Sequence, residues 1–222
     1  MNKRFIVALC VVWGLASSAS AGPQSTIGGA RLQTDMAHKV STGWPGTSYE
    51  WWNRGKNKLD WALGAELVYG PWSGAWDDPR IAAAIYAPLR FHLWEHQRQA
   101  AKTDLGFRFT PGLMAGSAAP NTAMVMTRAE LAVPVSVDVH PKVSIVTGGV
   151  IPVDLGWIEG TGFFGAIPLL VRLGVEIKAS DKTAPFILME VGPGIGFGQG
   201  GSDVTLAARL LGGLTFWSVR GK

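Results

Sequence analysis

The sequence predicts an all-β protein built as an antiparallel up-and-down β-barrel, and three observations lead to this prediction. Large apolar residues alternate with small or charged ones along most of the chain, as in strands that have one apolar face. The 29 glycines and 13 prolines favour turns and short connections over long helices. Only 16% of the residues are charged, against about 25% in an ordinary soluble domain.

The alternation divides the chain into ten candidate strands, with eight as the alternative. It is clearest in residues 123–140, where Val135 and Val137 oppose Ser136 and Asp138. The first two segments of the chain are less regular, and the others repeat the pattern of this example. In chain order, the remaining nine segments are 31–42, 47–52, 59–72, 81–94, 103–116, 143–154, 163–178, 184–197 and 204–217.

The connections between these segments alternate in character. One set is rich in Lys, Arg and turn-forming residues, and the other set contains small, apolar or acidic residues. Because adjacent hairpins turn at opposite ends of a sheet, the two sets mark the two ends of the barrel. With ten strands, both ends of the chain fall at the Lys- and Arg-rich end.

Residues 1–21 are predicted to be a secretory signal peptide. Lys3 and Arg4 precede an apolar run, and small residues precede a cleavage site after Ala21. Residues 22–222 then form one barrel domain, because no shift in composition divides them. Cys10, the single cysteine, leaves with the signal peptide, which excludes disulfides and thiolate chemistry in the processed chain.

The charge balance does not favour nucleic acid as a partner. Without Lys3 and Arg4, the 20 basic residues fall to 18 against 16 acidic ones, so the net charge is about +2. The basic residues form no stripe or cluster of the kind that binds phosphate backbones.

The length of the strands and the character of their two faces predict that the apolar face meets lipid. Most segments have 11 or more residues, whereas globular strands usually have about 3–10 and a tilted transmembrane strand needs about 9–11. The opposite face carries charges of both signs among small residues, which suits a lumen of paired ions. The candidates for these lumen ion pairs are Glu50, Glu66, Arg90, Arg108, Arg128, Glu130, Arg172, Glu176, Glu190 and Arg209.

Tryptophan positions favour the same prediction, because Trp is enriched at membrane interfaces. One end of the segments carries Trp44, Trp72, Trp76 and Trp157, and the other carries Trp61, Trp94 and Trp217.

The signal peptide, the dyad repeat and the terminal segment R209-L-L-G-G-L-T-F-W217 together resemble the small outer-membrane β-barrel proteins of bacteria with two membranes. The resemblance is architectural and covers the processed chain. It implies a location in the bacterial outer membrane, with outer-membrane lipid and the outer-membrane assembly machinery as partners. It also implies that the Lys- and Arg-rich turns face the periplasm. We expect a monomer.

One short motif invites a catalytic interpretation. His92-Leu93-Trp94-Glu95-His96 matches the H-x-x-E-H pattern, in which a helix places two zinc-binding histidines on one face. Here Pro88 and the alternating residues around it indicate a strand rather than a helix, and the sequence offers no third ligand. We therefore predict no metal site, no cofactor and no catalytic residues.

The sequence thus predicts an integral outer-membrane barrel that is not an enzyme. About ten strands enclose an interior that side chains can largely fill, so the expected role is structural or that of a narrow, porin-like pore. Two alternatives stay open: a barrel enzyme acting on lipid or peptide, and a soluble periplasmic barrel that binds an apolar ligand inside.

Overall fold

The structure is a computed structural model that describes residues 25–70, 81–98, 101–119, 121–199 and 201–217. The predicted signal peptide and two of the predicted interface tryptophans, Trp72 and Trp76, lie outside the described residues.

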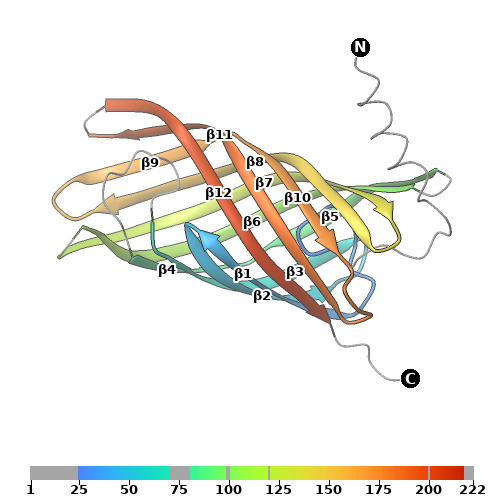
Figure 1. Ribbon diagram of the computed structural model, residues 1–222. Helices are drawn as coiled ribbons and strands as arrows, with labels where there is room; N and C mark the ends of the chain where they lie inside the picture. Colours follow the sequence, from blue (N-terminus) through green and yellow to red (C-terminus); the bar gives the residue numbers. More distant parts are fainter. Residues whose placement is uncertain (1–24, 71–80, 99–100, 120, 200, 218–222) are drawn as a thin grey trace, which may run out of the picture.

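The described residues form 12 strands in a closed antiparallel barrel (Figure 1). The wall closes where β12 pairs with β1, in a register that places Ala37 opposite Trp217. The bounds of the strands are β1 Met36–Trp44, β2 Gly46–Arg54, β3 Leu59–Val68, β4 Ile81–Tyr86, β5 Leu89–Arg98, β6 Ala101–Ala119, β7 Thr122–His140, β8 Val143–Ile158, β9 Gly162–Pro168, β10 Leu170–Ile177, β11 Thr183–Gly198 and β12 Gly201–Trp217.

Two positions in the wall each hold two strands in series. Both β4 and β5 pair with β3 and β6, and both β9 and β10 pair with β8 and β11, so the 12 strands form a ten-stranded barrel. At each interruption a proline of the neighbouring strand faces the gap. The Ala87 and Leu169 amides donate to the carbonyls of Pro111 and Pro193, and proline has no N–H to return the bond.

The prediction of an antiparallel barrel with ten strand positions is therefore confirmed. Segments 81–94 and 163–178, each predicted as one strand, are correct in position but are interrupted by these gaps. The first predicted segment, 31–42, begins too early, because β1 starts at Met36.

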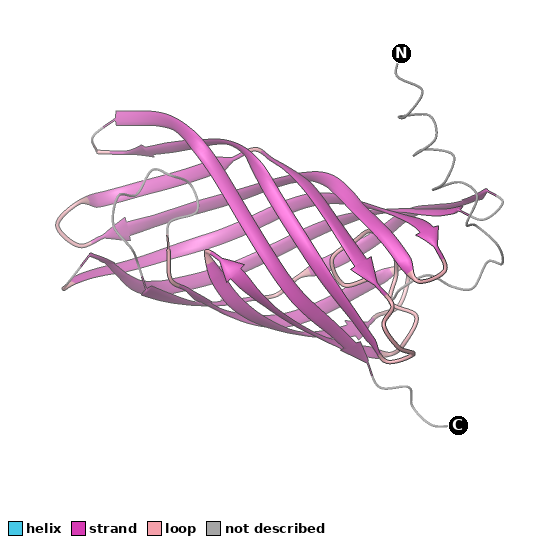
Figure 2. Cartoon of the chain, in the orientation of Figure 1, coloured by secondary structure: helices cyan, strands magenta, loops and turns pink. Residues whose placement is uncertain are grey.

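Most charged residues of the strands face the inside of the barrel, together with buried apolar clusters such as the one that contains Met114, Met126 and Phe164, whereas the large exposed side chains on the outside are apolar. Along β10 the pattern alternates at every residue: Arg172 and Glu176 are buried, whereas Val171 and Leu173 are exposed. The strands are tilted and run side by side around the whole wall (Figure 2). Because each of them carries exposed apolar side chains, the outer surface has a continuous apolar band.

Within the described residues, no helix is long and apolar enough to span a membrane.

Trp217 does not lie on the outer surface where the belt of interface tryptophans was predicted. Its side chain is buried inside the barrel with Trp52 and Leu32, at the end where β12 finishes. The alternation explains this, because Phe216 takes the outward position next to it. Trp44, Trp94 and Trp157 do lie exposed on the outside.

Candidate functional site

The interior of the barrel holds a network of buried ion pairs, and its simplest units join neighbouring strands. Arg172 and Glu190 face each other on β10 and β11, with Nη2 2.5 Å from Oε1. Arg128 and Asp154 face each other on β7 and β8, with Nε 2.9 Å from Oδ1. Directly opposite residues of antiparallel strands have the closest side chains, so each pair follows from the strand register.

Other ion pairs cross the lumen. Glu130 on β7 lies 3.0 Å from Arg209 on β12, measured between Oε2 and Nη1. Arg128, also on β7, reaches Glu66 on β3 with 2.9 Å between Nη1 and Oε2. These contacts join strands that are not neighbours in the wall. The middle of the lumen is therefore filled by charged side chains from several sides.

Glu130 is the carboxylate with the most cationic neighbours in this network. Arg108 Nη2 donates to Oε1 of Glu130 at 2.6 Å, and Arg172 Nη2 lies 3.7 Å from the same oxygen. Arg209 contacts the other oxygen and also lies 3.2 Å from Glu190. Charges in a low-dielectric interior need such partners, because an unpaired one loses its hydration without compensation.

Two further pairs use residues outside the predicted set. Lys39 Nζ lies 2.5 Å from Oε1 of Glu50, whose other oxygen accepts a hydrogen bond from the Trp52 indole. Arg90 Nη2 donates to Asp60 Oδ2 at 2.9 Å. Lys39, Asp60 and Asp154 are thus network members that were not predicted. Each lies on an inward position of a strand, which is the signal that could have identified them.

Glu176 differs from the other nine predicted lumen residues. Its side chain is completely buried, but neither carboxylate oxygen has a hydrogen-bond partner within the described parts of the chain. It also forms no ion pair with a described residue within 4.0 Å. The structure therefore brings nine of the ten predicted residues into ion pairs and leaves Glu176 apart from them.

The segment before β1 is inserted into the barrel. Ser25, Thr26 and Ile27 are buried, and the segment lies at the end of the barrel where β12 finishes (Figure 1). Polar side chains of the wall hold its backbone. Arg90 Nη1 donates to the carbonyl oxygens of Ser25 and Gly28 at 2.7 and 3.2 Å, respectively.

Contacts from other strands complete this attachment. The amide of Gly29 donates to Ser136 Oγ at 2.9 Å, and the amide of Leu32 donates to Asp60 Oδ2 at 2.9 Å. Thr26 and Thr215 join through their hydroxyls at 2.6 Å. The buried backbone of the inserted segment therefore obtains partners from β3, β5 and β7 rather than from a strand of its own.

Gly29 is the point of closest approach between the inserted segment and the wall. A Cβ at this position would lie 2.5 Å from the carbonyl oxygen of Pro134 and 2.8 Å from the amide nitrogen of Gly106. Both atoms belong to the backbone and cannot move aside as a side chain can. Only glycine allows the inserted segment to lie this close to β6 and β7.

Described residues enclose a small, polar cavity in the lumen. A cavity of about 70 Å³ lies between the inserted segment and the ion network, with Glu50, Glu66, Arg108 and Arg128 among its lining residues. This volume accommodates water molecules but not an apolar ligand of ordinary size.

We find no protein-family model, curated protein or solved structure that matches this chain.

Proposed function

We propose that the protein is an integral barrel of the bacterial outer membrane with a closed lumen and a structural role. The observation that carries the proposal is the inside-out distribution of its side chains. Exposed Val171, Leu173 and Ile187 on the outer face coexist with buried Arg172 and Glu190 on the inner face. A barrel surrounded by water would normally have the opposite distribution.

The extent of the outer apolar band supports lipid as its surroundings. Large exposed apolar side chains occur on every one of the 12 described strands, and charged residues on these strands face inward or lie near strand ends. Monomeric soluble proteins rarely expose continuous apolar patches of more than a few hundred Å². A closed barrel also pairs its backbone groups around the whole wall, as a bilayer requires.

The filled lumen favours a structural role over conduction. The ion network occupies the middle of the barrel, and the inserted segment, residues 25–32, occupies one end. An ion crossing the barrel would have to displace buried charges that already have partners. The small polar cavity also favours this role over the binding of an apolar ligand.

Extraction from cell envelopes tests the membrane part of the proposal. We expect the protein to stay with the envelope after washes with high salt and with alkaline carbonate, and to dissolve in detergent. The folded protein should also migrate differently from the heated protein on a gel. Release by salt or by freeze–thaw without detergent would show that the barrel is soluble.

Conductance in planar lipid bilayers tests the structural part. We expect the folded protein to insert without discrete current steps. Reproducible steps of one size, obtained with protein purified by two independent routes, would identify a narrow pore instead.

A further inference from the structure

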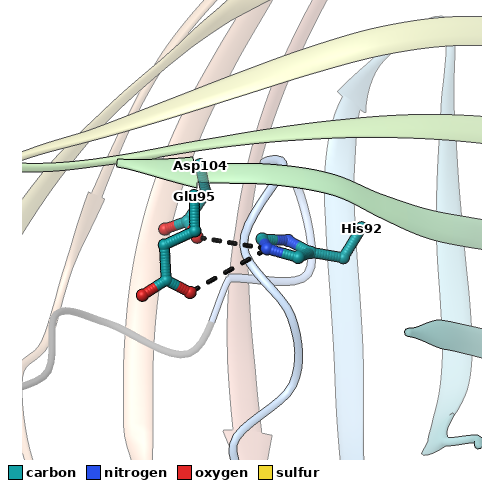
Figure 3. Close-up of side chains that lie close together, drawn as sticks. All are labelled: His92, Glu95 and Asp104. Carbon is teal, nitrogen blue, oxygen red and sulfur yellow. Dashed lines mark ion pairs between the residues drawn. The ribbon is translucent and has the colours of Figure 1, made fainter. Parts of the chain in front are cut away.

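A histidine and two carboxylates converge at the end of the barrel that contains the inserted segment. His92 and Glu95 come from β5 and Asp104 comes from β6 (Figure 3). The His92 Nε2 atom lies 3.9 Å from Glu95 Oε2 and 3.9 Å from Asp104 Oδ1. All three ligand atoms lie within 4.8 Å of one another.

A β-bulge creates this convergence. Residues three apart on a regular strand point to opposite faces, so His92 and Glu95 would not meet. The register between β5 and β6 shifts after the His92–Gly106 pair, and the next pair is Trp94–Leu105. Leu93 is the extra residue, and it returns Glu95 to the inner face, directly opposite Asp104.

The hydrogen bonding of His92 prepares its other nitrogen for a ligand role. Nδ1 lies 3.3 Å from the carbonyl oxygen of Gly29, and because a carbonyl only accepts, Nδ1 is the donor. In the neutral ring Nε2 then carries the lone pair, and Nε2 is the nitrogen that faces the two carboxylates. An N–H bond from the second ring nitrogen to a backbone carbonyl is the usual support of a metal-binding histidine.

Asp104 adds a buried acceptor that lacks a hydrogen bond. Its side chain is 1% exposed, and Oδ1 accepts no hydrogen bond from the described residues. A point equidistant from three atoms spaced this way lies about 2.3–2.5 Å from each, close to the 2.0–2.2 Å of zinc–nitrogen and zinc–oxygen bonds. Glu95 is half-exposed, so a small rotation of its side chain can close the difference.

We propose that His92, Glu95 and Asp104 form a binding site for a divalent first-row transition-metal ion, for which zinc is the probe. Imidazole with two carboxylates suits such an ion better than calcium, which takes six to eight oxygens. A cleft of about 610 Å³ beside His92 and Glu95 gives solvent access, so water can complete the coordination. The bound ion would tie β5 to β6 next to the inserted segment.

Lys102 provides the sharpest test, because its ammonium competes for the same oxygens. Nζ lies 3.3 Å from Glu95 Oε2 and 3.4 Å from Asp104 Oδ1. The Lys102 side chain is partly exposed and can swing into the cleft when an ion binds. Lys102→Met should therefore tighten zinc binding several-fold. If Lys102 is instead the permanent cation of this cluster, the same variant would not gain zinc affinity.

His96 provides the matched control. It belongs to the same H-x-x-E-H motif, but it stacks on the outward-facing Trp94, with ring centroids 5.4 Å apart. The sequence motif thus places one histidine inside and the other outside, and Asp104 supplies the third ligand that the sequence did not offer. His96→Gln should leave zinc affinity within about twofold, whereas His92→Gln and Asp104→Asn should weaken it about tenfold or more.

The experiment is calorimetric titration of zinc into the folded, detergent-solubilised protein, expressed without a histidine tag and freed of metal with a chelator. We expect one zinc per chain and a higher unfolding midpoint with zinc, a rise that is absent in His92→Gln. Folding of each variant is checked by circular dichroism. If His92→Gln fails to fold, Asp104→Asn and Lys102→Met still decide the question.

Three results would overturn the proposal. The first is a Lys102→Met variant that binds zinc no more tightly than the unmodified protein, which includes the case in which neither binds zinc. The second is an unchanged affinity in folded His92→Gln or Asp104→Asn. The third is a loss of affinity in His96→Gln equal to that in His92→Gln, which would indicate adventitious binding to surface histidines.

Discussion

Arg209 on β12 and Glu130 on β7 face each other across the interior of the barrel, with 3.0 Å between Nη1 and Oε2. The same carboxylate accepts a hydrogen bond from Arg108 and lies near Arg172. One acidic side chain therefore lies within 4 Å of guanidinium groups from three other strands. Arg172 and Arg209 reach Glu130 from strands that do not pair with β7, so these contacts join parts of the wall that share no backbone hydrogen bonds.

Glu130→Gln should lower the free energy of unfolding by about 3–5 kcal/mol, because it leaves buried arginines without their shared carboxylate. The measurement is urea unfolding in detergent, followed by tryptophan fluorescence and by gel mobility. Asp181→Asn is the control. The side chain of Asp181 is 97% exposed, and its ion pair with Lys178, at 3.7 Å, lies in an exposed turn and should contribute little to stability. Equal stabilities of the two variants would show that water solvates the network.

Arg128→Leu should also destabilise the barrel by about 3–5 kcal/mol, because it leaves two carboxylates in the lumen without this cation. These are Asp154 and Glu66, each 2.9 Å from the guanidinium. Addition of Asp154→Asn to Arg128→Leu should restore part of the loss, since one unpaired charge is then removed. Chemical unfolding of the two single variants and the double variant measures this coupling. Strictly additive losses would contradict a direct pair.

Gly29→Ala should displace the inserted segment, because the new methyl group would overlap backbone atoms of the wall. We expect a loss of about 1–3 kcal/mol, typical of overpacked interiors. Gly149→Ala is the matched control, because a Cβ there meets no atom within 4 Å. Thermal unfolding of both variants is the measurement, and a stable Gly29→Ala variant would place the segment outside the barrel.

Val171→Arg distinguishes a barrel in lipid from a barrel in water. Val171 is 64% exposed near the middle of the outer band. In a bilayer an arginine there should cost about 2–4 kcal/mol, and Val204→Arg, close to a strand end, should cost about 0–1 kcal/mol. In water both changes should stay within about 0.5 kcal/mol. Unfolding from lipid vesicles measures the difference, and equal small effects would contradict the proposed membrane location.

The barrel could be predicted from the sequence because the side-chain period of a strand is a local property. Alternation in segments such as 123–140 indicates both the strand and its two faces, without knowledge of any neighbour. The turns at opposite ends then follow from chain order. The interruptions at Ala87 and Leu169 were not predicted, because they depend on which proline of another strand lies opposite.

The candidate site was predictable only as a set of inward charges. Alternation places Arg128 and Glu130 inside, but it does not identify the carboxylate or guanidinium that each meets across the lumen. Those partners depend on the curvature and register of the closed wall. The inward positions of Lys39, Asp60 and Asp154 follow from the same alternation, whereas the position of Glu176 outside the ion pairs depends on the curvature and register of the wall.

By itself, the sequence determined the strand pattern and the polarity of the two faces, because these follow from local periodicity, and it predicted ten strand positions with eight as the alternative. Only the tertiary structure decided that residues 25–32 enter the lumen, since their burial depends on space and hydrogen-bond partners supplied by strands far along the chain. It also decided that His92 meets Glu95 and Asp104. A single bulge at Leu93 reverses the side-chain alternation there, and no local pattern signals it.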